Sequence, residues 1–279
     1  MKAATAVLAL VLPALVVAAG PGSAQAPGHA RPATVSVRAF GARGDGVAND
    51  TAAVQAAVDA APAGAVVYFP VGTYLVDDVQ VNRRRDLGFK GDGAASVLKR
   101  MPRPGNTRIA TFVGVTDIII SDLAFDANGI ERFGGVNFYD ARRVRIERTH
   151  FFDGRPQPPG PADRYAYVFG RGQNPSEDIV IAGNRIDGLQ LEVDHARRVR
   201  VSDNTVVRTA GTAGIGLFTL SDEAVAEDYT IARNTIVDPA GTGLAVHVDP
   251  PANGHAVFRR IRVTGNTVIR KSTAGPSIT

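Results

Sequence analysis

One short pattern recurs through the second half of the chain and limits the folds that are open to it. Each copy is a charged position followed by apolar residues at alternate places, which is typical of a half-buried β-strand. The copies begin at Asp117, Arg143, Asp178, Arg198, Asp228 and Arg260. Three positions after the final Ile or Val of the last four copies stands an asparagine: Asn184, Asn204, Asn234 and Asn266. A strand-and-turn unit repeated in this way predicts a solenoid of stacked coils, with the asparagines at one shared turn.

The segment at residues 37–76 adds a glycine loop, a helix and two strands. Residues 41–46 are rich in glycine and turn formers, so a sharp loop is expected there. A helix follows, for which Asn49 or Asp50 can supply the N-cap oxygen and which Pro62 ends. Its apolar residues fall at i, i+3, i+4 and i+7: Val54, Ala57, Val58 and Ala61. Residues 66–69 and 73–76 then predict a tight pair of strands.

In this order, the motifs resemble the N-terminal part of the pectate lyase superfamily, and within it the rhamnogalacturonase/epimerase-like pectate lyases. The matching residues are Phe40-Gly41-Ala42-Arg43-Gly44-Asp45-Gly46, Asn49-Asp50-Thr51, Tyr68-Phe69-Pro70 and Gly72-Thr73-Tyr74. The resemblance implies an all-β fold, a right-handed parallel β-helix with a short N-terminal capping α-helix, in which Asp45 and Asp50 are structural. Coils of such a helix lie about 4.8 Å apart, so the four asparagines are expected to form a hydrogen-bonded ladder.

The N-terminal residues have the features of a secretory signal peptide. Lys2 is followed by an apolar stretch at residues 3–19, and Ala24-Gln25-Ala26 offers a cleavage site. We therefore assign residues 1–26 as a signal peptide and expect a secreted protein, extracellular or periplasmic, after cleavage near Ala26. Residues 27–279 are expected to form a single β-helix domain, with the N-terminal cap and first coils at 35–98 and the repeat coils at 117–270. No other segment is apolar over the length needed to span a bilayer, so no membrane insertion is expected.

Composition restricts the partners. The chain has no cysteine, which excludes disulfides and thiolate metal sites. Its formal net charge is +4, and most of its basic residues are arginine, a side chain that pairs well with carboxylates. An acidic polysaccharide, such as a polyuronide, is the expected substrate. The arginine pairs at 142–143, 197–198 and 259–260 recur at one place in the repeat without neighbouring aromatic residues, so we expect solvated turn positions and no nucleic-acid partner. The oligomeric state is left open.

Each coil contains a further strand with a period of two, which begins at Gly135, Gly188, Gly214 or Gly243. When its apolar residues face the core, the outward residues are Asn137, Tyr139, Gln190, Glu192, Asp194, Phe218, His247 and Asp249. Alignment of the strands by their first glycines places Tyr139, Glu192, Phe218 and His247 in one column. Asp194 and Asp249 then lie one step further along. An acid, an aromatic ring and an imidazole on one face could hold a sugar chain, although an outward strand face is also polar simply because it meets water.

These residues supply the candidate site. The predicted catalytic residues are Glu192, His247, Asp194, Asp249 and Tyr139. The predicted substrate-binding residues are Asn137, Gln190, Phe218 and Tyr167. Tyr167 is on a strand at 165–169, which comes after the proline and glycine cluster of the longest insertion, residues 153–174. No metal ligand is assigned and no cofactor is certain, but Ca²⁺ held by Glu192, Asp194 and Asp249 is an open alternative. Of the other histidines, His195 is expected at the surface and His150 packed.

The activity is constrained less than the fold. The inward Asn-x-Asp, Asp-Asp, Gly-His-Gly and Arg-x-Lys set of polygalacturonases has no counterpart here, because Asp77-Asp78 lies in the wrong region and His255 lacks a following glycine. Lyase chemistry needs a base for the proton α to a uronate carboxyl group, and Tyr139 or His247 could serve. We therefore expect a polysaccharide-modifying enzyme, a lyase before a glycoside hydrolase. The alternative is a non-catalytic β-helix that binds glycans or envelope material.

Overall fold

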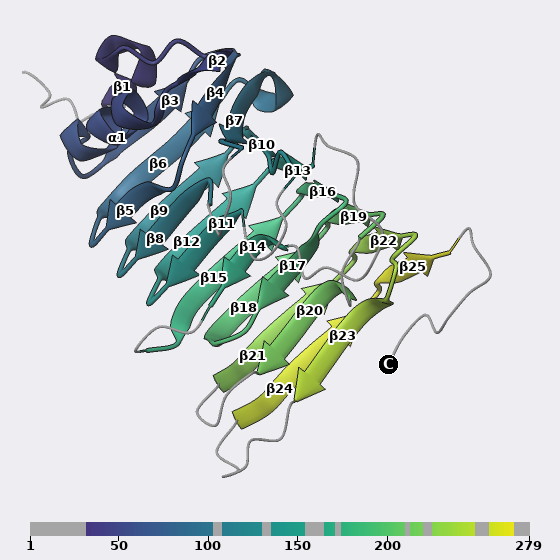
Figure 1. The fold of residues 1–279 in the computed structure, drawn as a ribbon. Coiled ribbons are helices and arrows are strands. Elements are labelled where there is room, and N and C mark those ends of the chain that lie inside the picture. The colour runs from purple at the N-terminus through teal and green to yellow at the C-terminus, as the bar shows by residue number, and fades with distance from the viewer. Residues whose placement is uncertain are drawn as a thin grey trace, which may run out of the picture. The chain divides into compact units, whose positions relative to one another are not determined.

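The computed structural model describes residues 32–102, 108–129, 135–153, 165–170, 174–209, 213–219, 225–248 and 257–270, so the predicted signal peptide lies outside the described residues. The chain winds in coils, and each complete coil gives one strand to each of three parallel sheets (Figure 1). The all-β prediction of a parallel β-helix is confirmed by this arrangement. Among the described residues, no helix is long and apolar enough to cross a membrane.

The three sheets are named here A, B and C, and their strands follow in spatial order. Sheet A contains β1 (Thr34–Ser36), β3 (Ala65–Phe69), β6 (Arg85–Gly91), β9 (Thr116–Ser121), β12 (Arg142–Glu147), β15 (Ser176–Ala182), β18 (Ala196–Ser202), β21 (Val225–Ala232) and β24 (Val257–Thr264). Sheet B contains β2 (Asp45–Asn49), β4 (Gly72–Val76), β7 (Ser96–Arg100), β10 (Ala124–Asp126), β13 (His150–Phe152), β16 (Arg185–Asp187), β19 (Thr205–Val207), β22 (Thr235–Val237) and β25 (Thr267–Ile269). Sheet C contains β5 (Val79–Asn82), β8 (Ala110–Val113), β11 (Val136–Tyr139), β14 (Tyr165–Phe169), β17 (Gln190–Val193), β20 (Ala213–Thr219) and β23 (Thr242–Val248). The six charged-apolar repeats are therefore successive strands of sheet A, as the pattern predicts.

The N-terminal segment forms η1 (Val37–Phe40) and α1 (Thr51–Ala60), which lie beside the first strands, and a further short helix, η2 (Gly93–Ala95), precedes β7 (Figure 1). Two details differ from expectation. The carboxylate of Asp50 does not cap α1 but accepts hydrogen bonds from the backbone N–H groups of Arg43 and Gly44, at 2.7 and 3.0 Å, and so fixes the glycine loop. The strands β3 and β4 do not pair with each other, because the chain turns a corner between them and each joins its own sheet.

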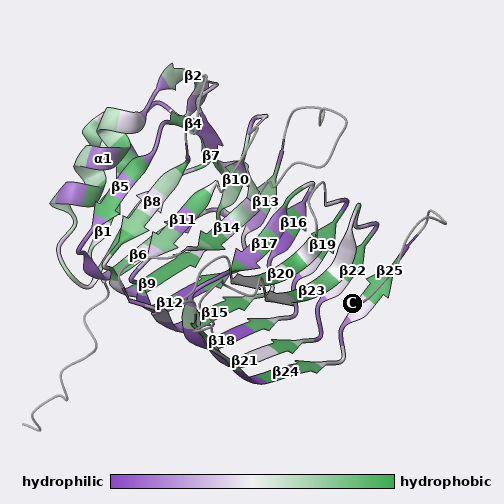
Figure 2. Ribbon diagram, turned by 60° about the horizontal axis from the view of Figure 1, so that its bottom comes forward, coloured by the Kyte–Doolittle hydropathy of each residue, from purple (hydrophilic) through white to green (hydrophobic). Residues whose placement is uncertain are grey.

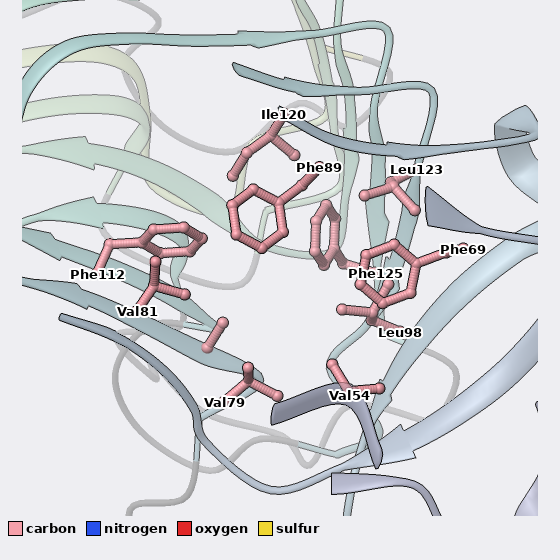
Figure 3. Close-up of a pocket in the computed structure, with 11 residues that line it drawn as sticks. Val54, Phe69, Val79, Val81, Phe89, Leu98, Phe112, Ile120, Leu123 and Phe125 are labelled. Carbon is pink, nitrogen blue, oxygen red and sulfur yellow. The ribbon is translucent and has the colours of Figure 1, made fainter. Parts of the chain in front are cut away.

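Apolar side chains from all three sheets fill the interior, and hydrophobic and hydrophilic residues alternate along the strands (Figure 2). In sheet C the rings of Phe112, Phe138 and Phe169 stack in consecutive coils, with centroids 4.7 and 4.6 Å apart. Near α1, a cavity of about 20 Å³ remains between Val54, Phe89 and other apolar side chains (Figure 3). A void of this size without polar lining is a packing defect of the core and not a substrate site.

The predicted asparagine ladder is present. The side-chain oxygens of Asn204, Asn234 and Asn266 each accept a hydrogen bond from the backbone N–H and another from the side-chain amide of the asparagine one coil earlier, at 2.9–3.0 Å. Thr149 occupies the preceding coil, where its hydroxyl donates to Asn184 and also bonds the hydroxyl of Tyr167 at 2.6 Å. The ladder therefore satisfies amides that the core would otherwise leave unpaired.

A second stacked column crosses sheet A, and it corrects the expectation that the paired arginines occupy turns. One residue in each of seven strands of sheet A has a positive φ of 50–60°: Asp86 in β6 and, in the six strands that follow, residues that alternate in charge. This charge column consists of Asp117, Arg143, Asp178, Arg198, Asp228 and Arg260. Each arginine bonds the aspartate one coil earlier in a bidentate pair, for example from Arg198 to Asp178 at 2.6 and 3.0 Å. The arginines are therefore strand residues whose charge is compensated within the column.

The charge column predicts a decline of stability in acid. Hydrogen bonds from the paired arginines lower the pKa values of Asp117, Asp178 and Asp228 in the folded protein. A lowered folded-state pKa stabilises the fold above the unfolded pKa, about 3.9, and this contribution is lost as the pH falls through the folded pKa values. Measured by urea unfolding, the contribution of the charge column to the free energy of unfolding should therefore be constant above about pH 5 and should fall below it. The variant Arg198→Gln should lose less stability on acidification than the wild type. Arg262→Gln removes an exposed arginine outside the column and should behave like the wild type. Equal dependence of the free energy of unfolding on pH in all three proteins would contradict this account.

Candidate functional site

The outer face of sheet C carries the predicted site residues, and the register of its strands decides which of them lie together. Asn137 of β11 is level with Val168 of β14, and Val168 is level with Glu192 of β17. Glu192 is in turn level with Gly216 of β20. Asn137 and Glu192 are thus two strands apart, about 10 Å between backbones, on either side of Val168.

A second row lies two residues further along the same strands. Phe218 and His247 are direct neighbours in it. The bonds from the Gly170 N–H to the Phe138 carbonyl and from the Asp194 N–H to the Phe169 carbonyl continue the register, which places Tyr139, Gly170 and Asp194 in this row. The predicted column is therefore wrong in one member, since Asp194 and not Glu192 is level with Tyr139. The alignment by glycines failed because Val136, directly after Gly135, is level through Tyr167 with Leu191, which comes three residues after Gly188.

Tyr139 lies against the next coil. A Cβ atom added at Gly170 would lie 2.8 Å from Cε1 of Tyr139, so the tyrosine ring rests over a position that has no side chain. The side-chain amide of Asn137 donates a hydrogen bond to the Tyr139 hydroxyl at 3.3 Å. This contact holds the hydroxyl in place on the sheet face, with the amide as donor.

Several polar side chains of this face are almost fully enclosed. Asn137 is 2% exposed, Glu192 5% and Asp194 8%. Both carboxylates have interaction partners, but Oδ1 of Asn137 has no hydrogen-bond partner within the described part of the chain. Buried polar atoms are normally satisfied, and an unsatisfied one at a strand face calls for an explanation such as a ligand. A polar, enclosed sheet face is also the setting in which charges and hydrogen bonds act most strongly on a bound molecule.

One predicted substrate-binding residue does not face this surface. Tyr167 is completely buried between the rings of Phe125 and Phe151, because it is level with the inward residues Val136 and Leu191. It is therefore a structural residue in this fold. Gln190 lies two residues before Glu192 in β17 and is completely buried. Its Oε1 accepts a hydrogen bond from the backbone N–H of Ala213, and its Nε2 has no hydrogen-bond partner among the described residues.

His195 was expected at the surface, but it is 6% exposed and its Nδ1 accepts a hydrogen bond from the Val225 N–H at 3.0 Å. That bond orders the corner between β17 and sheet A. His150 is packed as expected, with its ring 5.0 Å from that of Phe152, and burial lowers its pKa. Neither histidine belongs to the two outer rows.

Part of the predicted site lies beyond the described residues. Asp249 lies outside the described residues, as do most of the insertion after Asp153 and the side chains of Phe218 and His247. Among the described residues no group of three His, Asp or Glu side chains could hold a metal ion, and the proposed calcium set of Glu192, Asp194 and Asp249 includes a residue beyond them. The described part of the site consists of Asn137, Tyr139, Glu192 and Asp194, with Val168 and Gly170 between them.

Comparison with known proteins agrees with this fold. Mannuronan C5-epimerase AlgE1 of Azotobacter vinelandii is 60% identical over 243 residues, which cover 76% of this chain but 16% of that protein, so the chain spans only a small part of this relative. The solved A-module of mannuronan C-5 epimerase AlgE6 from the same organism has a TM-score of 0.61 at 22% identity, covering 85% of this chain and 66% of that chain. A ι-carrageenase in complex with ι-carrageenan fragments has a TM-score of 0.57 at 14% identity, covering 77% and 56%. At these identities the two structures show a shared fold alone. The family model for rhamnogalacturonase A/epimerase, pectate lyase-like proteins matches residues 34–269, and the chain belongs to this family.

Proposed function

We propose that this protein binds an acidic polysaccharide along the outer face of sheet C and modifies it at C5 of a uronate unit. The observation that carries the proposal is the polar set Asn137, Tyr139, Glu192 and Asp194 on a sheet face, of which all but Tyr139 are almost fully buried, with an unpaired amide oxygen among them. The relatives named mannuronan C5-epimerases support the choice of a polyuronate and of the C5 position.

The proposed chemistry begins with removal of the C5 proton, which is acidic because it lies α to the uronate carboxyl group. Tyr139 and Asp194 lie in one row of the face, and the ring of Tyr139 covers Gly170 between them. One of the two groups accepts the C5 proton, and the electron pair moves into the carboxyl group. General acid–base groups positioned in this way contribute about 10²–10⁴-fold to a rate.

Two outcomes can follow from the same first step. When the other group returns a proton to the opposite side of C5, the product is the epimer and the chain stays intact. When the bond from C4 to its oxygen breaks instead, the product is a shortened chain with a C4–C5 double bond, the lyase outcome. We favour chemistry at C5 over hydrolysis because hydrolysis leaves the C5 proton untouched, whereas the relatives named above act at C5. Phe218, His247 and Asp249 remain proposed members of the same groove.

The test uses the purified chain with polymannuronate and polygalacturonate in D₂O, with calcium and with a chelator. Proton NMR that shows exchange or inversion at C5 would support epimerisation, and ultraviolet absorbance of an unsaturated uronate would support a lyase. New reducing ends without either signal would point to hydrolysis and contradict the proposal. Tight binding of a polymer without any product would favour the alternative, a non-catalytic glycan-binding β-helix.

We also propose that the protein is exported, since Lys2 and the apolar stretch at residues 3–19 suit a signal peptide. Mass spectrometry of the mature N-terminus from an expressing bacterial culture checks this, with cleavage expected near Ala26.

A further inference from the structure

The outer face of sheet A carries a row of residues that point away from the core and take no part in the proposed reaction. This row lies next to the charge column, and register places one of its members in each coil: Gly88, Ile119, Arg145, Val180, Arg200, Thr230 and Arg262. Its three arginines are exposed and occupy every second strand. Since strands lie about 4.8 Å apart, their backbones are about 10 Å apart. Arg145, Arg200 and Arg262 are called the arginine strip below.

The strip differs from the charge column in how its arginines are paired. The column arginines are each held by an aspartate in a bidentate pair. In the strip, Arg145 is 3.7 Å from the Glu147 carboxylate and Arg200 donates one hydrogen bond to the Ser202 hydroxyl. No ion pair of Arg262 occurs within the described ranges. Most of the guanidinium donors of the strip are therefore available to an external anion.

A surface hollow lies at one end of the strip. It has a volume of about 520 Å³, and Ile119 and Val180 contribute apolar surface to it beside Arg143 and Arg145. Asp86, Asp117 and Asp178 also line it, and two of these carboxylates are already bonded to arginines of the charge column. Small-molecule sites typically measure about 300–1,000 Å³. An apolar floor with an arginine at its edge suits a sugar ring that carries a carboxylate.

We propose that the arginine strip is an accessory binding site for an acidic polysaccharide, separate from the outer face of sheet C. The identity of the polymer rests on the proposed function, but the binding does not require turnover. In an extended chain of acidic sugars the carboxylates on one side recur at every second unit, and each strip arginine can take one of them in a bidentate bond. Because the contacts are linked along one polymer, long chains bind more tightly than short ones.

The experiment compares two double variants of the full chain by fluorescence anisotropy with a labelled long polymannuronate and a labelled short oligomannuronate. The variant Arg200→Ala/Arg262→Ala removes two strip arginines. The control Arg148→Ala/Arg233→Ala removes the same charge from arginines that are bonded to Asp122 and Asp203. We expect the strip variant to weaken binding of the long chain roughly tenfold and the control to change it little, with the difference disappearing at high salt. Binding and turnover of the short chain should not change.

Equal losses of affinity in both variants would show that only net charge matters and would contradict the accessory site. Unchanged binding in the strip variant would also contradict it. The outcomes also separate this site from the proposed reaction. Strip-dependent binding without any C5 chemistry would support the accessory site and remove the proposed function. C5 chemistry with no difference between the variants would support the reaction and remove the strip.

Discussion

Replacement of Tyr139 by phenylalanine is expected to lower turnover of a polyuronate about 100-fold or more, while the protein stays folded. The change removes only the hydroxyl that accepts the Asn137 hydrogen bond, and it leaves the ring over Gly170. The loss should appear mainly in kcat, because the hydroxyl takes part in the proton transfer and contributes little to binding of the sugar chain. The measurement is the rate of C5 exchange or of double-bond formation, together with a thermal melt of each variant.

Tyr68→Phe is the matched control, since it removes a tyrosine hydroxyl that bonds Asp92 far from the two rows. It should leave turnover unchanged. Asp194→Asn should reproduce the loss seen for Tyr139→Phe, because it removes the second group proposed to carry a proton. In Gly170→Ala the new Cβ would meet the Tyr139 ring at 2.8 Å and push it away, so an intermediate loss is expected. Full activity in Tyr139→Phe would remove the tyrosine from the mechanism whatever the other variants do.

The sequence predicts the strands of sheet A and the asparagine ladder because both depend on local spacing. Each copy of the repeat contains its own alternation, and in the last four copies an asparagine follows at the same distance, so no knowledge of loop lengths is needed. The alternating charges of the column stand at the same place in the repeat and were equally visible in the sequence. Their pairing between coils could therefore also be predicted from the sequence.

The site was predicted less completely because it depends on register and burial. Loops of unequal length separate the strands of sheet C, so a glycine at the start of each strand is an unreliable marker of register. For this reason Glu192 was predicted in the row of Tyr139, whereas it lies in the row of Asn137. Tyr167 was assigned to the groove although its neighbours in the register, Val136 and Leu191, face inward. The near-complete burial of Glu192 results from packing around the sheet, which alternation along one strand cannot show.

Replacement of Asn204 by alanine is expected to destabilise the fold by about 3 kcal/mol. Asn204 stands in the middle of the ladder, where its amide donates to Asn234 and to the Ile181 carbonyl and its oxygen accepts from Asn184. Alanine leaves the buried N–H of Asn184 and the Ile181 carbonyl without these partners, and an unsatisfied buried group costs about 1–3 kcal/mol. Urea unfolding followed by circular dichroism measures the loss.

The size of the effect should depend on position in the stack. Asn266→Ala at the last described coil should cost less, because Asn266 is only partly buried and water can replace its bonds to Asn234. Asn82→Ala, at an exposed position of β5, should be close to neutral. A loss for Asn204→Ala no larger than that for Asn82→Ala would mean that the stacked Phe and aliphatic core alone holds the coils together. A graded loss in the order Asn204, Asn266, Asn82 would instead show that the amide ladder contributes to coil-to-coil cohesion in proportion to its burial.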